Sequence, residues 1–128
     1  MTRSAFTSPD APHAVGPYSQ AVASGDHVFL SGQTPIDPAT GALVEADVAG
    51  QAQRCFENLE AVLAAAGLTF DDVVKVNVYL TSMDDFAEMN AVYARHFTEP
   101  FPARTPVAVA ALPLGARIEL ELVAAVQR

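Results

Sequence analysis

The spacing of hydrophobic and polar residues changes along the chain, and each type of spacing predicts a strand or a helix. Alternation of apolar and polar residues, or a short apolar run between turn residues, predicts a strand. Apolar residues three or four positions apart predict a helix. The expected strands cover residues 3–7, 19–23, 27–34, 73–80, 105–111 and 117–126. The expected helices cover residues 48 to about 66 and 83 to about 97.

The first of these helices is the more strongly marked. Its apolar stripe consists of Val48, Ala52, Cys55, Phe56, Leu59, Val62, Leu63 and Ala66. Asp47 can cap its amino end, and Gly67 is a favourable residue at which to end it. For the second helix the signal is weaker: Ser82 with Asp85 three residues later can form a capping box.

This order of elements predicts one α+β domain over residues 1–128, a mixed six-stranded sheet with two helices on one face. The strand expected at 105–111 is apolar on both of its sides. Two helices can cover only one face of a sheet. The other face must be buried by something else, most simply another copy of the chain.

Composition and charge narrow the possible functions. The 128 residues carry a formal net charge of −8, and Lys75 is the only lysine. An acidic chain without a basic patch has no general attraction for nucleic acid or an anionic membrane. The single cysteine, Cys55, allows no internal disulfide, and the three histidines lack metal-ligand spacing, so we expect no metal. With no secretory signal and no long apolar run, we expect a cytoplasmic protein.

Arg104 is the first candidate for chemistry. It stands between Pro102 and Pro106 at the entry to the fifth expected strand. The prolines restrict the backbone on both sides and so help to fix where the guanidinium points. A fixed planar fork of donors suits a carboxylate or a phosphate. From spacing alone, a surface arginine or a structural salt bridge is the simpler explanation.

Glu119 and Glu121 alternate with apolar residues in the last expected strand, which places both carboxylates on the face without helices. If another chain covers that face, burial can alter their proton affinity; otherwise they are two solvated acids. In a hairpin of the last two strands, Arg104 would lie ~13 Å from Glu119. A site that uses both residues would then need two chains.

Three further segments are candidates for a ligand site. Asn90 falls beside the apolar stripe of the second helix, where its amide bonds either loop backbone or a ligand. Tyr18 follows the stiff Gly16-Pro17 turn, and Ser31-Gly32-Gln33 closes a strand. Glycine in such a place permits close approach of the backbone to a ligand.

Taken together, these segments resemble the RidA/YjgF family of enamine and imine deaminases, in order and over nearly the whole chain. The matching residues are Gly16-Pro17-Tyr18-Ser19-Gln20-Ala21, Ser31-Gly32-Gln33, Asp37-Pro38, Gly41, Asn58-Leu59, Val62-Leu63, Ala66-Gly67, Val74-Lys75, Asp85-Phe86, Asn90, Tyr93, Phe97, Phe101-Pro102-Ala103-Arg104, Leu112-Pro113 and Ile118-Glu119-Leu120-Glu121. The segments around the arginine and the two glutamates are the strongest matches.

The resemblance implies a YjgF/chorismate-mutase-like fold that assembles as a homotrimer, with a barrel-like centre and a ligand cleft at each subunit interface. It implies that Arg104 binds the substrate carboxylate and that Glu119 positions or activates water at the imine carbon. The residues implied to line the cleft are Tyr18, Ser31, Gly32 and Asn90, and backbone around Thr105 is implied to help hold the carboxylate. The implied substrate is 2-aminoacrylate or its 2-imino acid tautomer, released by pyridoxal-phosphate enzymes, and the products are a 2-oxo acid and ammonia. Orientation and a positioned acid or base suffice for this hydrolysis, so no cofactor is expected.

One position departs from the family pattern. Many members have a cysteine two residues after the arginine, where this chain has Pro106. Cys55 belongs to the first expected helix and cannot replace that thiol. A thiol-dependent role is therefore not expected, and the substrate preference can differ from that of the best-known subgroup.

Two other functions compete with the deaminase. An endoribonuclease activity is also attached to this family, but the acidic charge and the absence of a paired histidine or metal set argue against it. A trimer that binds small carboxylates without catalysis is the other alternative.

Overall fold

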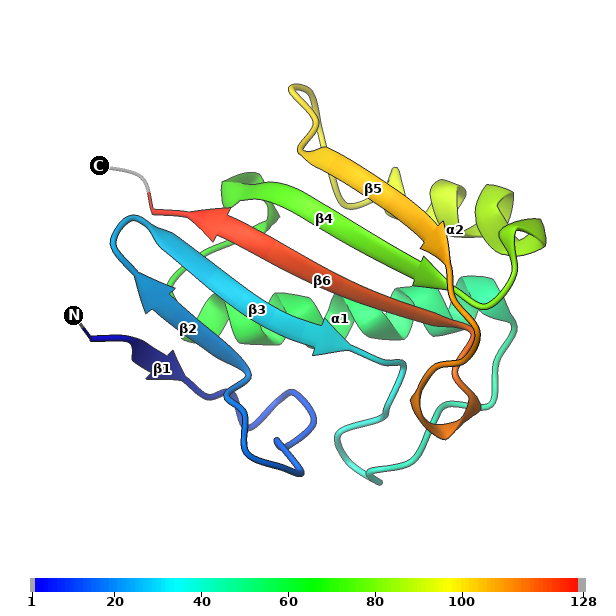
Figure 1. Cartoon of the computed structure of the whole chain (residues 1–128), viewed down its shortest axis with the longest axis horizontal. Helices are drawn as coiled ribbons and strands as arrows, with labels where there is room; N and C mark the ends of the chain where they lie inside the picture. The colour runs from blue at the N-terminus through cyan, green and yellow to red at the C-terminus, as the bar shows by residue number, and fades with distance from the viewer. Residues whose placement is uncertain (1, 127–128) are drawn as a thin grey trace.

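Six strands form one mixed sheet, and two helices pack on one of its faces (Figure 1). The computed structural model describes residues 2–126. The strands are β1 (Ser4–Phe6), β2 (Ala21–Ser24), β3 (His27–Gln33), β4 (Val73–Leu80), β5 (Ala103–Ala108) and β6 (Ile118–Ala125). Their order in the sheet is β1-β2-β3-β6-β4-β5. All neighbours are antiparallel except β4 and β5, which are parallel. The expected α+β fold is confirmed.

The long helix α1 (Val48–Ala65) begins and ends as its sequence predicts. The Asp47 carboxylate accepts a hydrogen bond of 2.9 Å from the Gly50 amide, which satisfies a free donor at the helix start. Gly67 follows the helix with φ of +74°, a left-handed conformation that glycine adopts without steric cost.

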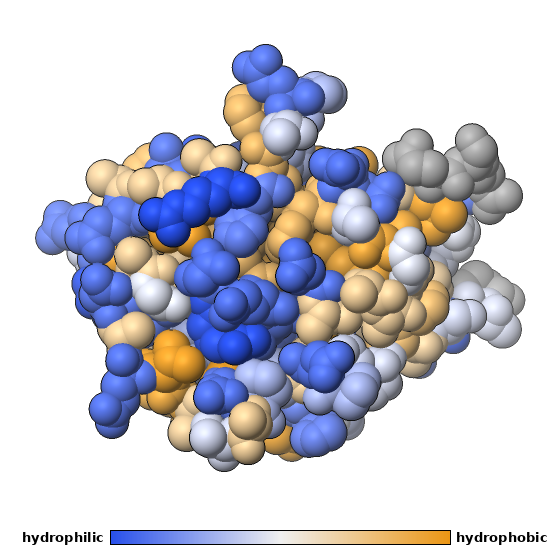
Figure 2. All heavy atoms as spheres, turned by 180° about the vertical axis from the view of Figure 1, so that it is seen from behind, coloured by the Kyte–Doolittle hydropathy of each residue, from blue (hydrophilic) through white to orange (hydrophobic). Residues whose placement is uncertain are grey.

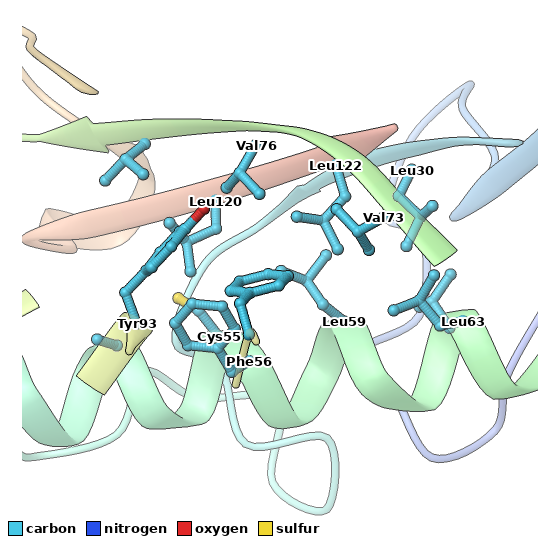
Figure 3. Close-up of a cluster of buried hydrophobic side chains, with 14 of the residues drawn as sticks. Leu30, Cys55, Phe56, Leu59, Leu63, Val73, Val76, Tyr93, Leu120 and Leu122 are labelled. Atoms are coloured by element: carbon cyan, nitrogen blue, oxygen red, sulfur yellow. The ribbon is translucent and has the colours of Figure 1, made fainter. Parts of the chain in front are cut away.

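The apolar stripe of α1 forms the core with the sheet. Figure 3 shows Phe56, Leu59 and Leu63 of α1 directed at the sheet, from which Leu120 and Leu122 of β6 point toward the helix. All five side chains are buried. Burying a side chain of this size contributes about 1.5–3 kcal/mol, so this layer fixes α1 against the sheet.

The second helix is much shorter than predicted. A 3-10 turn (Met83–Asp85) leads into α2 (Phe86–Tyr93), and the helix does not reach residue 97. After Ala94 the chain tightens, because the amides of Arg95 and His96 bond carbonyls three residues back. This turn brings His96 onto the ring of Phe56, with the centroids 4.3 Å apart, and buries Phe97. Aromatic packing between the helices therefore outweighs helix continuation.

The expected hairpin between the last two strands is wrong. β5 covers Ala103–Ala108 instead of 105–111 and pairs in parallel with β4, which lies between β5 and β6. The chain crosses back to β6 through a 3-10 turn (Pro113–Gly115). β5 is the edge of the sheet, and Val109 donates to Leu80, so residue 106 directs its nitrogen to the free edge. Pro106 therefore removes no bond from the ladder.

The face of the sheet opposite the helices is bare in a single chain. Figure 1 views the molecule from that face, with both helices behind the sheet. Phe29 and Val107 project from it and are 46% and 39% exposed. Figure 2 shows the helix side, where hydrophilic side chains gather over the middle of the surface. The prediction that helices cover only one face is confirmed.

Candidate functional site

Arg104 lies on the helix side of β5. Its register partner is Val76, whose side chain is fully buried under the helices. Partners in a parallel ladder project to the same side, so the guanidinium is directed at α2. Arg104 Nη1 donates a hydrogen bond of 2.6 Å to Asn90 Oδ1. The guanidinium carbon stands 4.7 Å from the ring centroid of Tyr93, a cation–π contact.

These contacts leave much of the guanidinium free. A cavity of about 440 Å³ opens beside it. Its lining consists of Asn90, Tyr93, Ala94, Phe101, Pro102 and Arg104. Arginine carries several N–H donors in one plane, and Asn90 uses one of its nitrogens. The remaining N–H groups can donate to both oxygens of a carboxylate in bidentate geometry.

Glu119 lies on the opposite, helix-free face of the sheet, on β6 beside Tyr79 of β4. Burial of its side chain raises the pKa of Glu119 above the ordinary carboxyl value, and the nearby charge of Glu121 raises it further. Glu119 is therefore a carboxyl group whose proton affinity suits proton transfer nearer to neutral pH.

Glu121 has a different environment from Glu119. It accepts a hydrogen bond of 3.0 Å from Asn77 Nδ2 and a short one from the Tyr79 hydroxyl. That hydrogen bond, followed by burial, raises the pKa of Tyr79 to about 12. Both partners donate to Glu121, so its side chain is held in place beside Glu119.

Ser31 lies on β3 next to Gly32, and Tyr18 belongs to the segment that precedes β2. Ser31 Oγ donates to the Ser19 carbonyl at 2.7 Å, and its amide donates to the Gln20 carbonyl at 2.9 Å. Ser31 therefore ties the segment that carries Tyr18 to β3. Tyr18 lines two hollows, one of about 620 Å³ with Ser31 and one of about 190 Å³ with Gly32.

Thr105 belongs to neither hollow. It pairs with Asn77 and so faces the helix-free side, where its hydroxyl accepts a hydrogen bond of 2.7 Å from Lys75 Nζ. Arg104 and Thr105 are adjacent in sequence, but their side chains lie on opposite faces of the sheet because neighbouring residues of a strand alternate.

The two candidate catalytic residues do not meet in one chain. Arg104 is level with Leu122 of β6 through Val76, three positions from Glu119. This offset is roughly 10 Å along the strands and roughly 10 Å across two strand spacings. The side chains also project from opposite faces. The structure thus groups Arg104 with Asn90 and, on the other face, places Glu119 beside Gly32.

Comparison with known proteins supplies the family. The family model described as Endoribonuclease L-PSP matches residues 8–126. Protein DfrA of Myxococcus xanthus is 52% identical over 126 residues, covering 97% of this chain and 96% of that protein. The 2-iminobutanoate/2-iminopropanoate deaminase of Salmonella typhimurium is 48% identical over 118 residues, covering 90% and 91%. This chain belongs to the RidA/YjgF family.

The fold agrees with this membership. The crystal structure of Escherichia coli TdcF with bound serine superimposes with a TM-score of 0.91 at 40% identity, covering 97% of this chain and 99% of that one. The RidA/YjgF resemblance read from the sequence is thereby confirmed. Within residues 2–126 no cluster of three or more His, Cys, Asp or Glu is placed to hold a metal ion. None of the helices in that range is long and apolar enough to cross a membrane.

Sequence reasoning missed two supports of Arg104 in this RidA/YjgF chain. Tyr93 was noted only as a family match, yet its ring lies under the guanidinium. Asp85, expected as part of a cap and as a match to the family pattern, is buried and accepts hydrogen bonds of 2.7 and 3.3 Å from Arg117. This ion pair ties the start of α2 to the start of β6, and α2 carries Asn90. An acid just before a short helix was the available signal, but its partner is 32 residues away.

Proposed function

We propose that this RidA/YjgF protein hydrolyses short 2-imino acids and their enamine tautomers, such as 2-iminopropanoate and 2-aminoacrylate, to 2-oxo acids and ammonia. The observation that carries the proposal is Arg104, held by Asn90 and Tyr93 beside a cavity with donors to spare. The Salmonella relative named for this activity is 48% identical to the chain. Such substrates arise from pyridoxal-phosphate enzymes, and we propose that the protein acts beside them in the cytoplasm.

Arg104 provides recognition in this mechanism. Its planar donors bind the substrate carboxylate in bidentate fashion and so set the position of the adjacent C=N carbon. The ring of Tyr93 and the Asn90 oxygen limit where the guanidinium can move. Serine bound to TdcF carries the same carboxylate beside an amino-bearing carbon, which supports a carboxylate site in this chain as well.

Glu119 provides the proton transfers. Water adds to the C=N carbon, one of its protons goes to the nitrogen, and the resulting carbinolamine loses ammonia to leave the 2-oxo acid. A carboxyl group with a raised pKa can orient the attacking water, accept its proton and return a proton to the leaving nitrogen. The reaction consumes one water and forms one ammonia, with no redox step.

The complete site is built from two chains of a homotrimer. Arg104 and Glu119 lie on opposite faces of one sheet, so one small substrate cannot reach both within a subunit. The helix-free face exposes Phe29 and Val107, which a neighbouring subunit would bury. In the cleft, Arg104, Asn90 and backbone near Thr105 of one subunit meet Glu119, Gly32, Ser31 and Tyr18 of the next.

The test uses 2-aminoacrylate formed in place by a serine dehydratase, with pyruvate release followed with and without the protein. We expect acceleration that Arg104→Ala removes and that Arg95→Ala, a change at an exposed arginine after α2, retains. Absence of acceleration by the wild type, with carboxylates still bound, would leave a binding protein. RNA cleavage by stringently purified protein that a cleft variant abolishes would instead support the activity in the family description.

A further inference from the structure

Strand β3 carries an irregularity beside Glu119. The β3–β6 ladder shifts register between Leu30 and Gln33, so that Ser31 and Gly32 stand opposite a single residue of β6. Leu30 and Gln33 are both buried. A β-bulge of this kind breaks the alternation of side-chain directions. It brings Gly32 to the face that carries Glu119.

The Glu119 carboxylate occupies the space that a side chain at residue 32 would need. A Cβ built on Gly32 would overlap Glu119 Oε2 and stand 2.9 Å from Cδ and 3.2 Å from Cγ. All three of its nearest atoms belong to Glu119. The carboxylate therefore lies directly on the Cα of Gly32, where β3 excludes part of the solvent from it.

We propose that Gly32 is a positioning residue for Glu119, because its lack of a side chain gives the carboxylate its place against β3. The catalytic meaning of this placement rests on the proposed deaminase function. The steric relationship itself does not. Gly32 then acts on the reaction through Glu119, in addition to lining the cleft.

Space, and not backbone conformation, requires glycine here. Gly32 is not among the glycines with positive φ, so an alanine can adopt its backbone conformation. The obstructing atoms form the end of a flexible side chain, which can rotate away. We therefore expect Gly32→Ala to fold and to displace the Glu119 carboxylate toward solvent. Gly16 is a matched comparison, because a Cβ there would meet its nearest atom at 3.8 Å.

The direct test is the titration of Glu119 followed by carbon NMR of labelled carboxyl groups, assigned with Glu119→Gln. Glu119 shares its face with Glu121 of β6 and Tyr79 of β4, and Cys55 of α1 lies within its electrostatic reach. Gly32→Ala changes none of these groups. We expect the pKa of Glu119 to fall toward the ordinary carboxyl value in Gly32→Ala and to stay at the wild-type value in Gly16→Ala.

Kinetics give the second readout. Gly32→Ala should lower kcat for imine hydrolysis about 100-fold while KM changes little, since the substrate carboxylate is held by Arg104. In a Glu119→Ala background, Gly32→Ala should cause no further loss, because the group it displaces is gone. A pure rise in KM, or an equal loss in both backgrounds, would show that Gly32 acts on the substrate directly and would overturn the proposal.

Failure of the proposed deaminase function can be distinguished from failure of the proposal that Gly32 positions Glu119. If the wild type does not hydrolyse imines but Gly32→Ala still lowers the pKa of Glu119, the positioning stands without the deaminase. If imines are hydrolysed and both the pKa and kcat are unchanged in Gly32→Ala, the positioning is wrong. Thermal unfolding of Gly32→Ala close to that of the wild type confirms that both readouts come from folded protein.

Discussion

The guanidinium of Arg104 stands over the ring of Tyr93, 4.7 Å from its centroid, and donates a hydrogen bond to Asn90 one turn earlier on the same helix. Without such contacts, an arginine side chain on an edge strand would sample many rotamers. Here Tyr93 and Asn90 of α2 both contact the guanidinium and limit its movement. Substitutions at single residues can separate the effects of these contacts on binding and on stability.

Tyr93→Phe should stabilise the protein. The Tyr93 hydroxyl is buried and has no hydrogen-bond partner among the described residues. An unsatisfied buried polar group costs about 1–3 kcal/mol, so its removal should raise the free energy of unfolding by about 1 kcal/mol in urea denaturation. The ring stays beneath Arg104, so KM should not change. Tyr93→Leu, which removes the ring, should raise KM; equal KM values for the two variants would argue against the cation–π support.

Asn90→Asp should weaken substrate binding. The new carboxylate would form an ion pair with Arg104, which Asn90 now contacts at 2.6 Å as a neutral acceptor. A bound carboxylate then competes with the substrate for the same donors, and we expect KM to rise about tenfold or more. Steady-state kinetics of Asn90→Asp beside Asn90→Ala provide the measurement. A KM for Asn90→Asp no higher than that for Asn90→Ala would mean that Arg104 does not receive the substrate carboxylate.

Glu119→Gln should lower activity strongly and yet stabilise the fold at neutral pH. Burial and then the Glu121 charge raise the pKa of Glu119 in the folded state, so ionising Glu119 is less favourable there than in the unfolded chain. The wild type gains this stability fully below the unfolded carboxyl pKa and loses it as the pH rises through the raised folded pKa. Urea unfolding at several pH values should show the advantage of Glu119→Gln at neutral pH and its disappearance in acid. A constant difference across pH would contradict the raised pKa.

His96 should make stability depend on pH in the opposite sense. Burial lowers the pKa of His96, which stacks on Phe56 and lies 3.1 Å from Gln53 Oε1. A lowered folded pKa gives stability that is present above the unfolded histidine pKa and is lost as the pH falls through the folded pKa. Melting temperatures measured from about pH 8 to about pH 5 should fall less for His96→Gln than for the wild type. Parallel curves for the two proteins would remove His96 as the cause.

Much of the fold was predictable because local patterns determine it. The strand expected at 73–80 matches β4 residue for residue, and Asp47 caps α1 as its type and place predict. The pairing of β5 was not predictable from local signals. A hairpin was the simplest connection across Pro113 and Gly115, but the two-sided apolar strand β5 instead takes the free edge of β4. The length of α2 depends on where His96 and Phe97 pack, which is a tertiary contact.

The candidate site was also predictable only where local sequence patterns mark its residues. Arg104 was found from its flanking prolines and Glu119 from its place in an alternating strand. The contact of Arg104 with Tyr93 joins distant segments of the chain. The contact of Glu119 with Gly32 depends on a shift of register between β3 and β6. The separation of Arg104 from Glu119 was expected from a wrong pairing. The structure makes it larger, because the two side chains leave opposite faces of the sheet.

Subunit complementation tests the two-chain site most directly. Arg104→Ala and Glu119→Gln, each strongly impaired alone, would be co-expressed with different tags, and oligomers carrying both tags would be purified. If the oligomer is the proposed trimer and each site takes Arg104 from one subunit and Glu119 from the next, a mixed trimer has both residues intact at about a third of its sites. Imine hydrolysis should then return to about a third of the wild-type rate per site. Mixed oligomers no more active than either parent would contradict the shared site.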